Sequence, residues 1–308
     1  ARFEVLQAFN KLAENLLPWV DLSRSREPGS PGHVLAAAAE LLFLEIKQSP
    51  WQTALSTTTH SSSDKVSIQF DMLKEQENIA KGLKDTEARW SSLAKAMRGL
   101  SSLTPKTMRR SSDLWTVSFA RVHSIDAGGP TREAYSIIAR DLELGGLDIV
   151  RPTPNNESHT GEGQDLHTVN PGATGREQMR LLAFLGQMMG VAIRTKSYMR
   201  FMLAPLVWKG LCGGVPSEGD LAAQDRKEYL RLTRIRDGRT PSGVELTPER
   251  FSEMYGGTRF VVKRGDGEEV ELCVGGGEMK VTWENKERFA ELALNYRLRK
   301  EGAPQIAA

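Results

Sequence analysis

The chain has 308 residues, of which 39% are hydrophobic and 26% charged, and its formal net charge is +2 at pH 7. These values exclude an intrinsically disordered chain and are typical of one large globular domain or two ordinary ones. The near balance of charge gives no reason to expect nucleic acid as a partner. The longest apolar block, residues 181–193, is too short to span a bilayer, so we expect no membrane insertion.

The cysteines and histidines are few and show no spacing typical of a metal site. The two cysteines, Cys212 and Cys273, have no neighbour at ligand spacing, and the five histidines form no HExxH arrangement. We therefore expect no disulfide framework, no metal and no cofactor, and a reducing, cytoplasmic compartment. Both thiols are predicted to be inert side chains of the protein core.

The first third of the chain is predicted to be mainly helical. Apolar residues at helical spacing predict a helix over residues 2–17, and the run VLAAAAELLFLEIKQ predicts another over residues 34–48. The alternating segment KVSIQF, residues 65–70, predicts a short strand, and two polar helices are expected between residues 71 and 100. We interpret residues 1–112 as a helical region that leads into the main domain.

A strand followed by a tight turn opens the main domain. The segment WTVSFA, residues 115–120, alternates like a strand, and the turn IDAGGPTREAY, residues 125–135, follows it. Pro130 has no N–H group to donate to a phosphate, and no nucleophile elbow surrounds Thr131, so we interpret the turn as a strand-to-helix corner. An alternative is an anion site formed by Gly128, Gly129 and Arg132.

The remaining residues predict helices interrupted by small hairpins. Helices are expected over residues 175–194, 197–212 and 220–236, and a closing amphipathic helix after residue 281. Between them, TRFVVKRG and EEVELCVGG predict two strands joined at Gly265–Asp266–Gly267. The predicted fold class is therefore α+β and mostly helical.

Four segments resemble, in the same order, motifs of the HECT family of ubiquitin ligases. The turn IDAGGPTREAY is similar to the family's signature at the end of a strand, and VTWENKERFAELALNYRL, residues 281–298, is similar to its closing helix. Between them lie NPGATGREQMRLLAFLGQMMGVAIR, residues 170–194, and LAPLVWKGLCGGVPSEGDLAAQD, residues 203–225. The opening segment FEVLQAFNKLAENLLPWVDL more loosely resembles the region upstream of the HECT domain in large ligases of the HERC type.

The resemblance implies the N-terminal lobe of a HECT domain, with a large helical subdomain and an inserted small one. Residues 113–220 and 281–308 correspond to the large subdomain, and residues 221–280 to the small subdomain, which in the family docks a ubiquitin-conjugating enzyme. The family's catalytic cysteine lies on a C-terminal lobe, and the sequence ends near the hinge that would precede it, so we expect that lobe to be absent. Neither Cys212 nor Cys273 has the Thr-Cys context of the family nucleophile, and no catalytic residue is predicted.

The partners implied by the resemblance are a ubiquitin-conjugating enzyme, ubiquitin and unknown protein substrates. A docking groove needs exposed apolar anchors. The family's aromatic position corresponds to Phe289, and an approximate alignment of the helix YLRLTRI adds Leu232 and Ile235. Arg132 and Glu133, which match the family's Arg-Glu pair, are interpreted as structural. The expected function is that of a HECT-type ubiquitin-protein ligase, and the alternative is a HECT-like scaffold that binds proteins without transferring ubiquitin.

Overall fold

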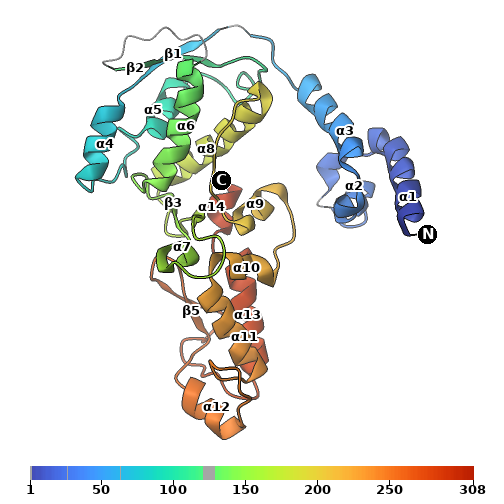
Figure 1. Cartoon of the computed structure of the whole chain (residues 1–308), viewed down its shortest axis with the longest axis vertical. Helices are drawn as coiled ribbons and strands as arrows, with labels where there is room; N and C mark the ends of the chain where they lie inside the picture. Colours follow the sequence, from blue (N-terminus) through green and yellow to red (C-terminus); the bar gives the residue numbers. More distant parts are fainter. Residues whose placement is uncertain (1, 26, 63, 121–128) are drawn as a thin grey trace. The chain divides into compact units, whose positions relative to one another are not determined.

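The computed structural model describes residues 2–25, 27–62, 64–120 and 129–308. The first four residues of the predicted strand-to-helix corner, residues 125–128, lie outside the described residues. The chain forms two compact units, the first of residues 1–62 and 109–111 and the second of residues 63–108 and 112–308 (Figure 1). The structure thus divides the chain near residue 62, and not at the predicted boundary at residue 112.

The first unit is a small group of helices. It contains α1 (Arg2–Leu16), α2 (Pro31–Ala37) and α3 (Leu44–Thr57), with one-turn 3-10 helices at Leu17–Trp19, Leu22–Arg24 and Ala39–Leu41. The predicted single helix over residues 34–48 is wrong, because the chain leaves the helical path between α2 and α3. The Asn10 side chain stabilises this break: its Nδ2 donates to the Leu41 carbonyl (2.9 Å) and its Oδ1 accepts from the Phe43 N–H (2.7 Å).

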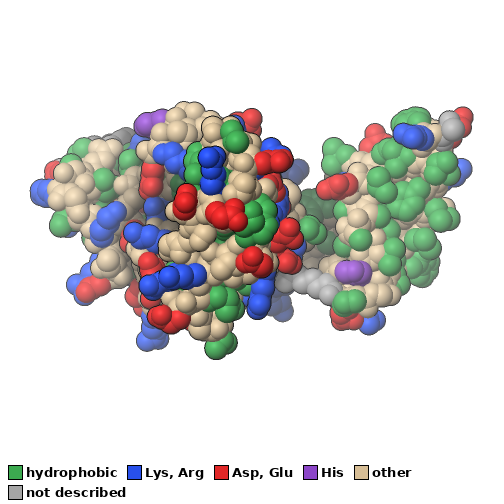
Figure 2. All heavy atoms as spheres, turned by 90° about the horizontal axis from the view of Figure 1, so that it is seen from below, with side chains coloured by type: hydrophobic (Ala, Val, Ile, Leu, Met, Phe, Trp, Pro, Cys, Tyr) green, Lys and Arg blue, Asp and Glu red, His purple; other side chains and the backbone are tan. Residues whose placement is uncertain are grey.

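Most large apolar side chains of the first unit face the solvent. Leu17 and Leu42 are buried, whereas Phe3, Leu12 and Trp19 are exposed. Figure 2 shows hydrophobic side chains over much of the visible face of this unit. Because the hydrophobic contribution grows with the apolar area removed from water, burial stabilises the first unit only weakly.

Two parallel strands tie residues 63–108 to the later chain. β1 (Val66–Phe70) pairs with β2 (Trp115–Phe119) along its full length. Parallel strands need a long crossover connection, and this one contains α4 (Met72–Ala80) and α5 (Ser92–Gly99). The sequence predicts both strands and the structure confirms them. Their pairing explains why the division between units lies before β1 and not at residue 112.

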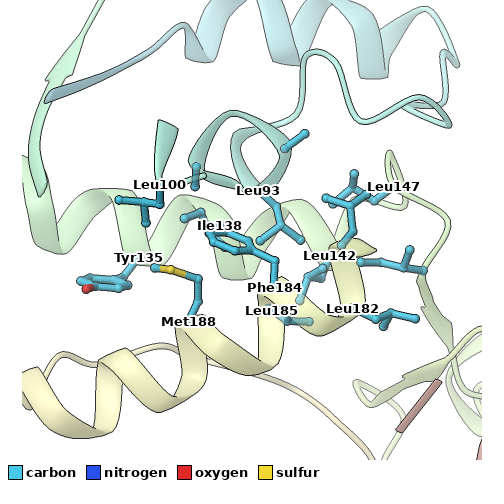
Figure 3. Close-up of a cluster of buried hydrophobic side chains, with 14 of the residues drawn as sticks. Leu93, Leu100, Tyr135, Ile138, Leu142, Leu147, Leu182, Phe184, Leu185 and Met188 are labelled. Carbon is cyan, nitrogen blue, oxygen red and sulfur yellow. The ribbon is translucent and has the colours of Figure 1, made fainter. Parts of the chain in front are cut away.

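The larger hydrophobic cluster of the second unit lies among α5, α6 (Gly129–Glu143) and α8 (Arg176–Thr195) (Figure 3). Leu93 from α5, Ile138 from α6 and Phe184 from α8 meet in this cluster. The apolar residues of α6 and α8 recur at helical spacing, so each helix buries one face. This cluster, which we call the first cluster, is the main core of the second unit.

Short helices and two antiparallel strand pairs complete the second unit. β3 (Val150–Pro152) pairs with β4 (His167–Val169), and β5 (Val261–Lys263) pairs with β6 (Glu269–Glu271), which confirms the predicted hairpin. The remaining helices are α7 (Pro154–Ser158), α9 (Pro205–Cys212), α10 (Glu218–Gln224), α11 (Arg226–Asp237), α12 (Pro248–Tyr255), α13 (Lys286–Arg299) and α14 (Ala303–Ala307). The mostly helical α+β fold class is confirmed. Within the described part of the chain, every helix is too short or too polar to cross a bilayer.

Candidate functional site

A second hydrophobic cluster is centred on residues 221–280, which we call the small subdomain. Its buried side chains come from α10, α11, α12, β5 and the loops between them, and α13 completes it. The rings of Phe260 and Phe289 meet edge to face, with centroids 5.4 Å apart and planes at 76°. Phe251 packs in the same way on Trp283, at 5.6 Å and 81°. Edge-to-face packing is a favoured aromatic geometry, so this second cluster is a well-ordered core.

The three predicted docking residues lie inside the second cluster. Leu232, Ile235 and Phe289 are each 0% exposed. Leu232 and Ile235 are three residues apart on α11, so they share the helix face that packs on α13, which carries Phe289. The Arg231 guanidinium covers the Phe289 ring, with Cζ 5.9 Å from the ring centroid. The expectation that these side chains are exposed anchors is therefore wrong; they form the core beneath the surface.

Other apolar side chains of the small subdomain do face the solvent. Val244 is 60% exposed, Met254 46% and Val274 100%. Val244 lies in a closed loop, in which Thr240 N–H donates to the Val244 carbonyl (2.8 Å) and Val244 N–H donates to Thr240 Oγ1 (3.0 Å). The hydroxyl of Tyr255, beside Met254 on α12, donates to the Arg239 carbonyl (2.9 Å) at the start of that loop.

These exposed residues are the candidate docking surface that sequence reasoning missed. Helical spacing identifies apolar residues on long helices, and such residues usually pack inward. The useful signal was instead an apolar residue in a polar, turn-rich segment, such as Val244 in TPSGVE. A hydrogen-bonded loop presents that side chain with little loss of conformational entropy on binding, which favours recognition.

Charged groups stiffen the helices behind this surface. Glu228 of α11 accepts from Arg231 (2.7 Å) on its own helix and pairs with Arg297 of α13 (3.3 Å). Burial alone would raise the pKa of Glu228, but hydrogen bonding and charge from these two arginines lower it below its usual value. Arg236 pairs with Glu218 of α10 (2.7 Å). Ion pairs between different helices fix how α10, α11 and α13 pack.

The two cysteines differ in their surroundings. Both are free thiols; Cys212 is exposed at the end of α9, and Cys273 is partly buried after β6. The prediction that both are core side chains is therefore wrong for Cys212. Arg132 and Glu133 are exposed on the first turn of α6, and Gly128 of the alternative anion site lies outside the described residues.

Comparison with known proteins identifies the family. The sequence profile described as HECT-domain (ubiquitin-transferase) matches residues 147–308, which is more than half of the chain. The chain belongs to the HECT-domain family. The match covers β3 to α14 and so includes the whole small subdomain. The family resemblance inferred from the motifs is confirmed.

Several curated HECT-type proteins are similar to this chain. The E3 ubiquitin-protein ligase HERC2 of Mus musculus is 31% identical over 209 residues, which are 68% of this chain and 4% of that protein. The probable E3 ubiquitin-protein ligase HECTD4 of Homo sapiens is 26% identical over 322 residues, which cover 97% of this chain and 8% of that protein. The E3 ubiquitin-protein ligase TOM1 of Saccharomyces cerevisiae is 24% identical over 182 residues, 59% of this chain and 5% of that protein. The chain thus spans a small part of these relatives' length.

Proposed function

We propose that this chain acts within a HECT-type ubiquitin-protein ligase and that its small subdomain docks a ubiquitin-conjugating enzyme charged with ubiquitin. In the reaction, a ligase thiolate attacks the thioester carbonyl of the charged enzyme. Ubiquitin is then bound to the ligase sulfur, and the conjugating enzyme leaves as its free thiolate. The role of this chain is proximity, because docking turns an encounter between two proteins into a reaction on one scaffold. The receiving cysteine is neither Cys212 nor Cys273, and the final acceptors are protein substrates.

The observation that carries this proposal is an ordered core with apolar side chains exposed around it, in a chain of the HECT family. Val244 and Met254 project from two elements joined by the Tyr255 hydrogen bond. Binding energy at protein interfaces comes from a few anchors on a rigid support. The buried residues Leu232 and Phe289 supply that support from below.

Substitution of the exposed anchors tests the docking proposal. Immobilised chain is titrated with a panel of conjugating enzymes joined to ubiquitin by a stable amide. We expect at least one to bind with a Kd in the range of about 1–100 μM, which is typical of transient interfaces. Met254→Asp and Val244→Asp should each raise that Kd at least about tenfold, because a charge must then be desolvated at the contact.

A matched control separates this surface from exposed valines in general. Val215 lies in the loop between α9 and α10, outside the small subdomain, and is 73% exposed. Val215→Asp should leave the Kd unchanged. Equal weakening by Val215→Asp and Val244→Asp would contradict the proposed surface, as would the absence of binding by every enzyme in the panel.

A second experiment tests the assignment of the receiving cysteine. The 308-residue chain is mixed with charged conjugating enzyme and analysed with and without a reducing agent. We expect no reducible ubiquitin adduct. An adduct that disappears in Cys212→Ser or Cys273→Ser would show that one of these thiols is the nucleophile. The alternative function is a binding scaffold. It would be favoured if chains extended beyond these 308 residues also failed to carry ubiquitin on a cysteine.

We include a cytoplasmic location in this proposal. Transfer through thioesters requires free thiols, and a reducing compartment keeps them free. The two cysteines of this chain are free. Fractionation of cells that express the protein tests this location, and recovery of the protein in a secretory compartment would contradict it.

A further inference from the structure

The turn between β5 and β6 is rigid by itself. Arg264 Nε donates to Asp266 Oδ1 (2.9 Å), and Arg264 also pairs with Glu268. Across the turn, Arg264 N–H donates to the Glu268 carbonyl (2.7 Å) and Gly267 N–H to the Arg264 carbonyl (2.8 Å). Hydrogen bonding from Arg264 lowers the pKa of Asp266 below its usual value. The hairpin therefore presents a preformed, charged tip.

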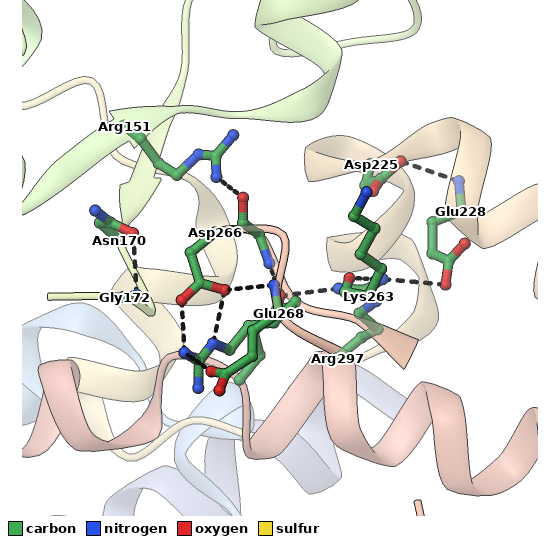
Figure 4. Close-up of polar contacts among 12 residues, drawn as sticks. Arg151, Asn170, Gly172, Asp225, Glu228, Lys263, Asp266, Glu268 and Arg297 are labelled. Atoms are coloured by element: carbon green, nitrogen blue, oxygen red, sulfur yellow. Dashed lines mark hydrogen bonds and ion pairs between the residues drawn. The ribbon is translucent and has the colours of Figure 1, made fainter. Parts of the chain in front are cut away.

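Side chains from outside the hairpin hold both backbone polar groups of one residue in this tip, Gly265. The Gly265 N–H donates to Oε1 of Glu301, a residue that follows α13 (2.8 Å). The Gly265 carbonyl accepts from Nη1 of Arg151, which lies on β3. Figure 4 shows the Arg151 guanidinium directed at the turn that carries Asp266. Arg151 is itself oriented by Glu157 of α7 (2.9 Å). The tip of the small subdomain is thus fixed to an element that the family resemblance assigns to the large subdomain.

The hairpin tip packs closely against Arg151 and Pro171 on one side and borders an open hollow on the other. A methyl group on Gly265 would lie 3.2 Å from Arg151 Nη1 and 3.4 Å from Pro171 Cγ, and one on Gly172 would lie 2.9 Å from Asp266 Oδ2. Beside this contact is an open hollow of about 410 Å³. Its lining is polar and consists of Asp148, Arg151, Glu157, Asn170, Gly265 and Asp266.

The contact between Arg151 and Gly265 is polar, unlike the packing within the two hydrophobic clusters. Among the described residues, the first and second clusters have no residue in common. Between them, polar contacts join the subdomains: besides Arg151 with Gly265, the Asn155 side chain accepts from Arg226 N–H (2.8 Å). Because α13 completes the second cluster, it turns together with the small subdomain. A change of angle at the polar contacts then exposes little apolar core, so side-chain hydrogen bonds decide the angle.

We propose that Arg151 is a positioning residue that, with Glu301, holds the β5–β6 tip and so sets the orientation of the small subdomain against the large one. This inference rests on the proposed function, because orientation matters if the small subdomain carries the charged enzyme. A bound enzyme turns with the subdomain, so the Arg151 contact determines where its thioester is presented. Ubiquitin transfer depends on that placement, since small displacements of reacting groups slow a reaction strongly.

The orientation is measured with two spin labels on the 308-residue chain, by the distribution of distances between them. Cys212→Ser and Cys273→Ala remove the native thiols, and labels are attached at Gln187→Cys on α8 and Glu253→Cys on α12, both exposed positions. The labelled chain that keeps Arg151 should give one narrow distribution of distances. Arg151→Ala should widen it at least about twofold, because the tip is released from one side.

Three further variants make the result specific. Arg151→Lys keeps a cation and should restore much of the narrow distribution. Glu301→Gln should widen it less than Arg151→Ala, because the amide oxygen still accepts from Gly265 N–H. The control is Arg180→Ala, which removes an ion pair within α8 (Arg180 to Glu177, 2.9 Å) and should change nothing. An unchanged distribution in Arg151→Ala overturns the proposal, even if that variant melts at a lower temperature.

Binding separates this proposal from the docking proposal. Arg151→Ala leaves the Val244 and Met254 surface intact, so its Kd for the charged conjugating enzyme should stay within about threefold of the parent value. A much weaker Kd in this variant would mean that Arg151 belongs to the docking surface, which contradicts a positioning role. If no enzyme binds the parent chain but Arg151→Ala still widens the distribution, the docking proposal fails and the control of orientation stands.

Discussion

The two units of this protein use the same apolar residue types in opposite ways. Trp115 of the second unit is 1% exposed and lies in the first cluster, whereas Trp19 of the first unit is 87% exposed. The second unit buries two clusters, and the first unit buries few large side chains. Apolar composition therefore does not indicate stability; the area removed from water does. The second unit should hold most of the free energy of folding.

The largest effect should come from removing a ring of the second cluster. Phe289→Ala deletes a side chain that is 0% exposed and that packs on Phe260. We expect the free energy of unfolding to fall by about 3–5 kcal/mol, because the substitution loses transfer free energy and leaves a cavity. Urea unfolding monitored by circular dichroism measures the change.

The matched control for that substitution lies in the first unit. Phe3 is exposed, and its ring lies 6.4 Å from that of Phe43. Phe3→Ala should cost less than about 1 kcal/mol, as is usual for surface substitutions. A loss at Phe3 as large as that at Phe289 would contradict the contrast between the units.

A buried pair of carboxyl groups in the second unit should make its stability depend on pH. Glu75 Oε1 and Asp141 Oδ2 both accept from the Ser92 N–H, at 2.9 and 2.8 Å, at the start of α5. Burial first, and then the hydrogen bond and charge of Glu75, raise the pKa of Asp141 well above its usual value. Two carboxyl oxygens this close are stabilised by one proton between them.

The sign of the pH effect follows from the raised pKa of Asp141. The unfolded chain loses the Asp141 proton near the ordinary value of about 4, while the folded chain keeps it to higher pH. The stability contributed by this proton is complete below the pKa of Asp141 in the unfolded chain and is lost as pH rises through its pKa in the folded chain. Its size is about 1.4 kcal/mol for each tenfold difference in proton affinity between the folded and unfolded chains. Asp141→Asn should flatten this slope and be more stable than the parent at alkaline pH. Urea midpoints of the parent chain and of Asp141→Asn, measured from pH 4 to pH 9, show how the stability of each depends on pH. Equal dependence in the two chains would show that the folded chain holds no extra proton at Asp141.

A smaller effect is expected from removing most of the first unit. Because its apolar side chains are largely exposed, a chain that lacks residues 1–59 should retain the main thermal transition within about 3 °C. The parent should show an additional, weaker transition at lower temperature in scanning calorimetry. A single transition in the parent, shifted strongly by the deletion, would mean that the first unit stabilises the second.

The smallest effect should come from the most exposed tryptophan. Trp19→Ser should change the free energy of unfolding by no more than about 0.5 kcal/mol, because the ring is already in water. Trp115→Ser is the opposite case and should lower the free energy of unfolding by about 3–5 kcal/mol, because it empties a buried site. Equal effects of the two substitutions, measured in the same urea titration, would refute the comparison.

Local patterns predicted much of the fold. Alternation identified β1 and β2, and the Gly265–Asp266–Gly267 turn identified the β5–β6 hairpin, because these features depend on residues close in sequence. The break between α2 and α3 could not be predicted, since it depends on hydrogen bonds from Asn10, more than thirty residues away. The parallel pairing of β1 with β2 was missed for the same reason.

The candidate site was predictable only in outline. Family motifs predicted a docking site around residues 221–280 and the start of the closing helix, but the residues chosen there, Leu232, Ile235 and Phe289, are core. Helical spacing shows that a face is apolar and does not show whether another helix covers it. The contact of Arg151 with Gly265 joins residues 114 positions apart, so no local pattern indicates it.

Hydrogen exchange of the chain with and without a charged conjugating enzyme tests the central claim most directly. If the small subdomain is the docking surface, enzyme at saturating concentration should slow exchange in residues 239–255, which contain Val244 and Met254. Exchange in α8 should not change. Protection confined to the first unit or to α8, with none in residues 239–255, would contradict the account.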